Sequence, residues 1–281
     1  MKIKITSDST CDLSQELLER FHIAIRPLYV VKDGVSYRDG VDITTADIYA
    51  HVAAGGKLCS TAAVSERDYE KFFARELEGY DGLVHTTISS EMSSCYQNAC
   101  VVAKKFKNVQ VVDSRNLSSA QGLIVMAGAE LAAQGDKTAE EVAQYMRDLT
   151  PKVDASFVVD DLTYLRKGGR CSTAAALSAN LLNIKPCIEV HSGSMTVAKK
   201  YRGHYDKVLR TYVRERLAGN DTLDLKRIMV THTPVPDGTV DLVKEEIRAC
   251  QSFAEILETE ANCTVACHCG PHTLGILYIH K

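Results

Sequence analysis

The chain has 281 residues, 45% of them hydrophobic and 25% charged, with a formal net charge of −3 and no Trp. A chain of this length can bury a sizeable core, most simply as two domains, and its charge balance gives no reason to expect a nucleic-acid or membrane surface. The first residues lack the apolar core of a signal peptide and no apolar run is long enough to cross a bilayer, so we expect a cytoplasmic protein.

The first half of the chain alternates between strand and helix patterns. Strands are expected at four apolar runs, residues 3–5, 25–31, 82–85 and 109–112. Helices are expected at 13–20, directly after Thr44, at 65–78, 95–103 and 118–133, and from Thr138 to just before Pro151. Capping signals open three of them: Asp12 with Gln15, Thr44 with Asp47, and Thr138 with Glu141. Asp33-Gly34 predicts a hairpin turn. The alternation is typical of a parallel α/β sheet.

Polar residues follow several of these strands. The segment 6–10 follows the first strand, 87–94 follows the third, and Asp113-Ser114 ends the fourth. Parallel sheets bind their ligands at the carboxyl ends of their strands, so a site is expected at this edge.

The stretch 87–99 is central to the functional interpretation of the sequence. It places Ser89, Ser90, Ser93 and Ser94 at the junction of a buried strand and a helix. The first backbone N–H groups of a helix lack partners, and with nearby hydroxyls they can hold a carboxylate or a phosphate. The alternative is that one serine only caps the helix, and the stretch alone does not decide between them.

The second half mixes hairpins with helices. Strands are expected at 156–159, 188–190, 195–197, 228–231, 254–257 and 274–279, with a turn at Ser192-Gly193. Helices are expected at 174–182, which is rich in small residues, and at 205–217 and 239–248. We therefore predict an α/β protein in which an N-terminal parallel-sheet α/β domain, residues 1–153, packs on a C-terminal α+β domain, residues 154–281, with a shared cleft.

A cluster near the C-terminus has the composition of a metal site. It comprises Cys263, Cys267, His268, Cys269 and His272, but paired C-x-x-C motifs are missing. Part of the run resembles a strand, which would turn alternate side chains to opposite faces. The ten cysteines are otherwise scattered, so reduced thiols are expected, and structural zinc stays an alternative to a binding site without metal.

Two basic segments allow more than one interpretation. Lys167-Gly168-Gly169-Arg170 is compatible with a phosphate loop, a partner surface or a helix end capped by glycine. Arg170 and Arg202 are candidates for contact with a phosphate or an acidic partner. Motifs for nucleotide hydrolysis, dinucleotide binding, zinc proteases and serine hydrolases are absent from the sequence.

Several segments together resemble the DegV family of fatty-acid-binding proteins. They are Thr-Ser-Asp-Ser-Thr-Cys-Asp-Leu at 6–13, Tyr-Arg-Asp-Gly-Val-Asp at 37–42, the serine-rich run 88–97, Val-Asp-Ser at 112–114, Gln-Gly at 121–122, 161–170, Leu-Leu-Asn-Ile-Lys-Pro at 181–186 and His-Cys-Gly-Pro at 268–271. Each is weak by itself, but they cover nearly the whole chain in family order.

The resemblance implies a carrier that encloses one long-chain fatty acid in an apolar tunnel between and within the two domains. The family's carboxylate contacts fall on Thr61, Ser93 and His268, with Ser94 and Arg170 in supporting positions. Ala62, Ala63, Ser94, Cys95 and His272 depart from the usual family residues, so the resemblance implies local hydrogen bonding and chain selectivity that differ from the family pattern.

The resemblance also implies a bacterial partner, a separate fatty acid kinase that forms an acyl phosphate for phospholipid synthesis. Arg202 is then a partner-facing residue, and the chain itself has no catalytic residue, metal or cofactor. An alternative from the residues is an acyl-transfer or hydrolytic enzyme with Ser93 as nucleophile and His268 as base. A third interpretation, based on the cysteine and histidine cluster near the C-terminus, is a zinc-dependent regulatory domain.

Overall fold

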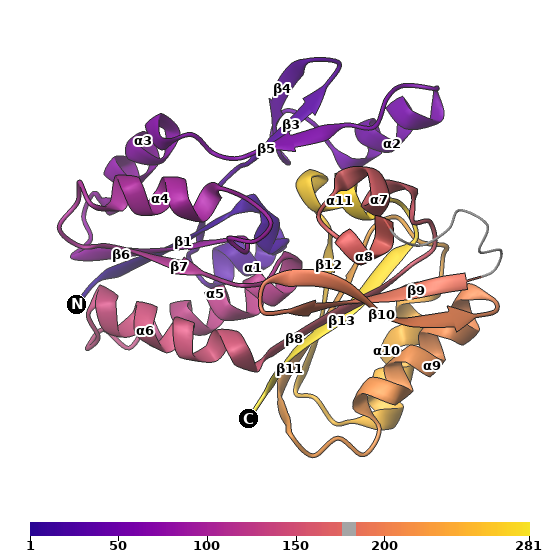
Figure 1. Cartoon of the computed structure of the whole chain (residues 1–281). Coiled ribbons are helices and arrows are strands. Elements are labelled where there is room, and N and C mark those ends of the chain that lie inside the picture. The colour runs from indigo at the N-terminus through magenta and orange to yellow at the C-terminus, as the bar shows by residue number, and fades with distance from the viewer. Residues whose placement is uncertain (176–183) are drawn as a thin grey trace.

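The computed structural model describes residues 1–175 and 184–281, and Figure 1 shows two packed domains in this part of the chain. The N-terminal domain holds a parallel sheet of order β2-β1-β6-β7. Its strands are β1 (Ile3–Asp8), β2 (Ala24–Arg26), β6 (Gly82–Thr87) and β7 (Val109–Asp113). All of β6 is buried, as expected for a central parallel strand covered on both faces. The predicted parallel-sheet domain is confirmed.

Helices cover both faces of this sheet. Figure 1 shows α3 (Glu66–Leu77) and α4 (Cys95–Ala103) on one face, with α5 (Ser118–Ala132) and α6 (Ala139–Leu149) on the other. Neighbouring residues of β6 point to opposite faces of the sheet. Leu83 packs with α3 and α4, and Val84 packs with α5 and α6.

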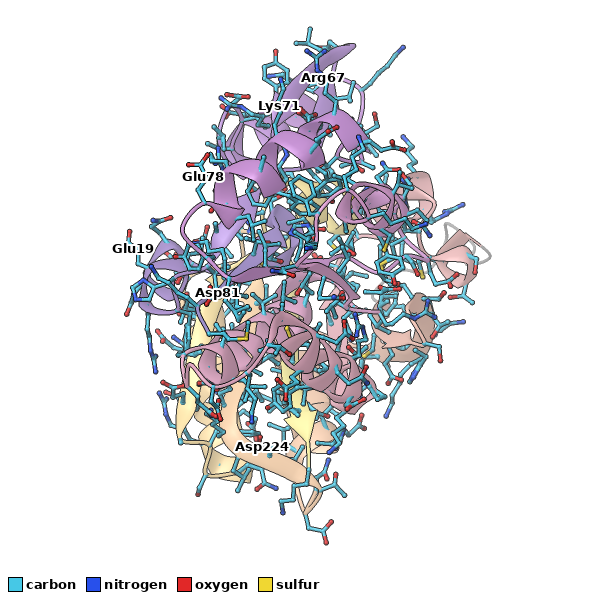
Figure 2. All side chains as sticks on the ribbon, turned by 90° about the vertical axis from the view of Figure 1, so that its left-hand side faces the viewer. Glu19, Arg67, Lys71, Glu78, Asp81 and Asp224 are labelled. Carbon is cyan, nitrogen blue, oxygen red and sulfur yellow. The ribbon has the colours of Figure 1, made fainter. Side chains whose placement is uncertain are left out.

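Helix α3 shows how the sequence pattern decides which side is buried. Tyr69, Phe72 and Phe73 are buried, whereas Arg67 and Lys71 lie at the outer surface, where Figure 2 labels them. Apolar residues three and four apart form one helix face, so the charged residues between them point to solvent.

Helix α5 packs between the two domains. It has no charged residue before Glu130, and nearly every side chain along it is buried. It contacts β1 of the first sheet and β8, β11 and β13 of the second. A helix that is apolar on all sides needs such a fully enclosed position.

The second domain contains a mainly antiparallel sheet of order β10-β9-β8-β13-β11-β12. Its strands are β8 (Val153–Val159), β9 (Ile184–His191), β10 (Ser194–Arg202), β11 (Leu223–His232), β12 (Glu255–Glu260) and β13 (Thr273–His280). Its helices are α7 (Thr163–Gly168), α8 (Ser172–Ala175), α9 (Tyr205–Leu217), α10 (Thr239–Cys250) and α11 (Cys263–Cys269). The α+β character of this half is confirmed, as is its Ser192-Gly193 hairpin turn.

A small antiparallel sheet projects from the first domain. Its order is β4-β3-β5, with β3 (Tyr29–Lys32), β4 (Val35–Arg38) and β5 (Ser60–Ala62). Helix α2 (Thr45–Ala53) lies beside it and starts with the predicted capping box of Thr44 and Asp47. Short 3-10 turns occur at Ser9–Cys11 and Thr150–Lys152.

Three local predictions need correction. Residues 25–31 do not form one strand, because Pro27 has no N–H to donate and the chain passes there from β2 to β3 in another sheet. Helix α1 (Gln15–Arg20) is capped by Ser14 rather than Asp12, which is buried in a left-handed conformation. The run 263–269 is a helix and not a strand. It packs between the two domains, and these tertiary contacts, which the local sequence does not show, favour the helix.

The expected helix at 174–182 begins inside the described residues as α8, and positions 176–183 lie outside them. Among the helices that the structure describes, none combines the length and apolar character needed to cross a membrane.

Candidate functional site

Thr61 and His268 meet at the junction of the two domains, although 207 positions separate them in the chain. Thr61 lies in β5 and His268 in the last turn of α11, and Thr61 Oγ1 is 2.9 Å from His268 Nε2. An imidazole protonated at Nε2 donates to Thr61 and leaves the threonine hydroxyl proton free for a ligand. The structure therefore brings two of the predicted carboxylate contacts together.

Ser93 lies across from them in the loop between β6 and α4. Its Oγ accepts a hydrogen bond from Cys95 N at 3.3 Å and is 3.2 Å from Cys95 Sγ. Within the described residues it forms no hydrogen bond to Thr61 or His268, yet all three line one cavity. Ser93 thus contacts the first residue of helix α4 and also lines the cavity. A role at the helix start and a role in an anion site are therefore compatible.

Two carboxylates hold this loop in place. Asp8, at the end of β1, accepts from Ile88 N at 2.8 Å, and Asp113, at the end of β7, accepts from Ser90 N at 3.1 Å. Asp8 is fully buried, and this burial raises the pKa of its carboxyl group above the usual value. The polar residues at the strand ends thus act largely as loop anchors.

Helix α11, which carries His268, is positioned by the first domain. Asp12 accepts from Asn262 N at 2.9 Å, one residue before the helix starts, and from Ser118 Oγ at 2.6 Å. The side chain of Asn262 donates to Ser9 O at 2.9 Å. Sequence reasoning missed Asp12 and Asn262 in this role, since nothing local connects positions 250 residues apart.

Gly168 determines how closely α7 approaches His268. A Cβ atom added at Gly168 would lie 2.3 Å from His268 Nδ1, well inside van der Waals contact. Nδ1 is buried without a hydrogen-bond partner among the described residues. Gly168 therefore positions the imidazole of His268. Gly169, in the left-handed conformation, is the glycine that ends helix α7.

The electrostatics of His268 favour a neutral ring. Burial, with a smaller contribution from the Arg170 guanidinium, lowers the pKa of His268 to about 4. At neutral pH the imidazole is therefore a hydrogen-bonding group without charge. Arg170 is the one cationic side chain among the described residues that line this cavity.

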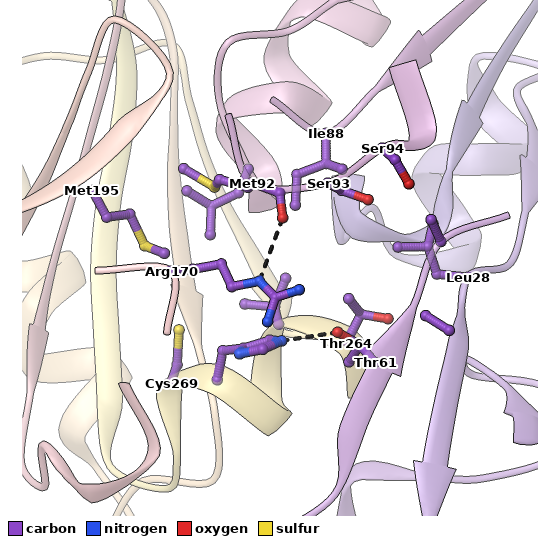
Figure 3. A pocket seen from close by; sticks show the side chains of 15 residues that line it. Leu28, Thr61, Ile88, Met92, Ser93, Ser94, Arg170, Met195, Thr264 and Cys269 are labelled. Carbon is purple, nitrogen blue, oxygen red and sulfur yellow. Dashed lines mark hydrogen bonds between the residues drawn. The ribbon is translucent and has the colours of Figure 1, made fainter. Parts of the chain in front are cut away.

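The supporting residues occupy different places. Arg170 lines the cavity, its Nη1 donates to Gly168 O at 2.9 Å, and Figure 3 shows it between Met92 and Thr61. Ser94 also lines the cavity and precedes α4, without a capping hydrogen bond from its side chain. Arg202 lies exposed at the end of β10 and is not part of the lining.

Two cavities adjoin at this junction. The head cavity, about 130 Å³, has polar residues Thr61, Ser93 and His268 on a wall that is otherwise largely apolar. The inner cavity, about 30 Å³, lies between the start of α5 and strands β8, β11 and β13. Leu117, Val265 and Cys269 line both cavities and separate them. The head cavity therefore carries polar side chains on a mainly apolar wall, and the exposed surface of the inner cavity is almost entirely apolar.

The cysteine and histidine cluster is dispersed by the helix. Cys263 Sγ donates to Ile43 O at 3.2 Å, Cys267 packs near Cys59, and His272 Nδ1 faces Asp160 at 3.4 Å. In residues 1–175 and 184–281, no three His, Cys, Asp or Glu side chains gather as a metal site requires.

Comparisons with known proteins agree with this architecture. A sequence model of the DegV family, described as an uncharacterised protein family, matches residues 2–281. A DegV domain-containing protein of Clostridium acetobutylicum is 30% identical over 285 residues, which cover 100% of this chain and 99% of the relative.

Two solved structures share the fold over nearly their full lengths. A DegV family protein from Thermus thermophilus, described as fatty acid binding, superposes with a TM-score of 0.88 at 30% identity, with 100% of both chains covered. A stearic acid-binding protein from Eubacterium ventriosum superposes with a TM-score of 0.81 at 26% identity, covering 99% of this chain and 98% of the other. On the family match and these similarities, the chain belongs to the DegV family.

Proposed function

We propose that this protein binds one long-chain fatty acid and presents its carboxylate to a separate fatty acid kinase for acyl-phosphate formation. The acid's carboxylate would lie between Thr61, Ser93 and His268, with Arg170 beside it. The observation that carries the proposal is the convergence of these side chains, from β5, the β6–α4 loop and α11, on one largely apolar cavity.

The chemistry of the head cavity suits a carboxylate. Burying a carboxylate without partners costs several kcal/mol, so a site for one needs convergent donors. The hydroxyls of Thr61 and Ser93 supply two, the neutral imidazole orients the first, and the Arg170 guanidinium supplies positive charge. A phosphate would bring more negative charge into a cavity that has one cation, so a carboxylate is the better match.

The acyl chain would continue toward the inner cavity. Burial of each CH₂ group contributes about 0.8 kcal/mol, so the chain would supply most of the affinity. Both cavities are well below the roughly 300 Å³ at which pockets for sizeable ligands begin. Leu117 and Val265, which lie between them, would have to change rotamer on binding. The two solved relatives described as fatty-acid-binding support the ligand class.

Extraction of the purified protein tests the proposal directly. Native mass spectrometry should show a mass increase that disappears after organic extraction, and the extract should contain fatty acid in about equimolar amount. The delipidated protein should then rebind the same acid. Protein purified without fatty acid that also binds none after delipidation would contradict the proposal.

Substitution of Ser93 by Ala should weaken fatty acid binding by about tenfold, because one donor to the buried carboxylate is lost. The affinity of delipidated protein for a fluorescent fatty acid measures the effect. Ser252→Ala, at an exposed position, is the control and should bind as the unaltered protein does. Equal affinities in the two variants would leave Ser93 with its role at the start of α4 alone.

Hydrolytic or acyl-transfer activity remains the alternative function. A serine nucleophile needs its base within about 2.6–3.2 Å. In the described structure His268 Nε2 contacts Thr61, and Ser93 contacts Cys95, so that pair is not assembled. Turnover of acyl esters that is lost in Ser93→Ala would establish the enzyme and contradict the carrier.

Arg202 is proposed to contact the kinase. It is exposed and belongs to no ion pair among the described residues, so its charge is available to a partner. We expect Arg202→Ala to leave fatty acid affinity unchanged and to lower kinase turnover of the bound acid severalfold. Lys200→Ala, two residues earlier on the same strand, is the matched control. Unchanged turnover in Arg202→Ala would contradict a partner-facing role.

A further inference from the structure

A third cavity adjoins the head cavity and has a different chemical character. It measures about 350 Å³ and shares Arg170 and His268 with the head cavity. Lys57, from the segment before β5, and Lys167, from the end of α7, also line it. We call this space the basic pocket.

The charge of the basic pocket is uncompensated. No Asp or Glu is among the described residues that line it. Lys57, Lys167 and Arg170 form no ion pair in the part of the chain that the structure describes, whereas most of the arginines there, unlike most of the lysines, do. The whole chain has a net charge of −3, whereas this one cavity is lined by three cationic side chains and no acidic one among the described residues. Such a concentration of positive charge attracts anions.

Arg170 connects the two cavities. Its Nη1 donates to Gly168 O at 2.9 Å, and its Nε lies 3.4 Å from Met92 O. These contacts use two of the five guanidinium N–H groups and hold the side chain between the β6–α4 loop and the end of α7. Figure 3 shows the contact to Met92. The remaining donors are free to contact an anion on either side.

We propose that the basic pocket receives the phosphate group of the acyl phosphate that forms on the bound acid. This inference rests on the proposed function. In that reaction one carboxylate oxygen forms a bond to the terminal phosphorus of a nucleoside triphosphate on the kinase, and the bond from that phosphorus to the departing nucleoside diphosphate breaks.

The new phosphate is joined directly to the carboxylate oxygen, so it must lie next to the head cavity. It also brings additional negative charge, which the single cation of the head cavity does not balance. Lys57 and Lys167 lie where that charge would develop, just beyond the residues shared by the two cavities. The pocket would therefore retain the product more tightly than the substrate.

The test compares two ligands that share an acyl chain. One is the fatty acid, and the other is a long-chain β-ketophosphonate, a non-hydrolysable analogue of the acyl phosphate. Dissociation constants are measured for delipidated unaltered protein, for Lys57→Gln/Lys167→Gln, and for Lys104→Gln/Lys107→Gln, which removes the same charge from exposed positions at the end of α4. Arg170 is left in place because it serves both cavities.

The pocket variant should bind the phosphonate at least about tenfold more weakly, since two charge-assisted contacts are lost, and should bind the fatty acid as before. The control variant should bind both ligands normally. Equal weakening in both double variants, or unchanged phosphonate binding in the pocket variant, would overturn the proposal while leaving the carrier function intact. Unaltered protein that binds neither ligand would contradict the carrier function as well.

A membrane surface is the other source of phosphate that such a pocket could meet. Binding to vesicles of anionic phospholipid is therefore measured for the same three proteins. Vesicle binding that is lost in the pocket variant, while its phosphonate affinity is unchanged, would identify a lipid contact and overturn the proposal. Loss of phosphonate affinity with unchanged vesicle binding supports it.

Discussion

At the scale of single residues, the candidate site depends on a neutral histidine. His268 bonds to Thr61 through Nε2, and burial together with Arg170 keeps its pKa near 4. A lone histidine near a chain end gives no sign of this in the sequence, because the shift arises from the surrounding tertiary structure. The consequence is a site in which hydrogen bonding and Arg170, rather than an imidazolium, receive the anion.

Fatty acid binding should raise the pKa of His268, because a nearby carboxylate favours the protonated ring. Titration of the His268 NMR signal should give a value of about 4 without ligand and a higher one with it. The exposed His204 is the reference, and its signal should not respond to ligand. A His268 titration that is the same with and without fatty acid would place the carboxylate elsewhere.

The same shift has a consequence for stability. The folded-state pKa of His268 lies below the usual 6.5, so the unfolded chain binds the proton more readily. The free energy of unfolding therefore falls as the pH is lowered from 6.5 toward 4, and bound fatty acid should reduce this loss.

At the scale of elements, the site is assembled by the docking of α11 against α7 and β5. Asp12 and Asn262 fix the start of α11, and Gly168 lets α7 come close to its last turn. None of these three residues needs to touch a ligand, yet each one sets where His268 lies.

Gly168→Ala should therefore weaken fatty acid binding by about tenfold or more, because its Cβ would lie 2.3 Å from His268 Nδ1 and the ring would have to move. Gly169→Asn is the matched control, since Asn tolerates the left-handed conformation and no atom lies within 4 Å of the added Cβ. Affinity and urea midpoint are measured for both. Normal affinity in Gly168→Ala would show that the ring position does not matter.

At the scale of the whole molecule, a charged network joins the domains at the edge away from the site. Arg227 in β11 contacts Glu130 of α5 at 2.7 Å and Glu255 of β12 at 3.2 Å. Arg20 of α1 also contacts Glu255, at 2.8 Å. Arg227 is only 5% exposed, so its charge depends on these partners.

Arg227→Met should lower the free energy of unfolding by about 2 kcal/mol, because two charge-assisted contacts are lost and Glu130 and Glu255 keep only Lys226 and Arg20 as partners. Lys226→Met is the control, since that exposed pair with Glu130 contributes less than about 1 kcal/mol. Urea denaturation measures both. Similar midpoints for the two variants would contradict a special role of the buried network.

The alternation of strand and helix in the first half, the capping boxes at Thr44 and Thr138 and the two hairpin turns are local in origin. They were predictable because hydrophobic period and turn chemistry act over a few residues. The errors at Asp12, at 25–31 and at 263–269 share one cause. In each case a contact distant in sequence, or a change of sheet, overrode the local preference.

The candidate site also combines features that the local sequence indicates with features that only the tertiary structure creates. The sequence by itself, through its resemblance to a family, pointed to Thr61, Ser93 and His268, and its serine-rich strand end indicated an anion site. Only the tertiary structure shows that Thr61 contacts His268 and that Lys57 and Lys167 line one cavity. It also shows that Asp8 holds the β6–α4 loop and that Asp12 holds the start of α11. The physical reason is that side-chain identity and period are local properties, whereas burial, pKa and the meeting of distant residues come from the packing of two domains around α5.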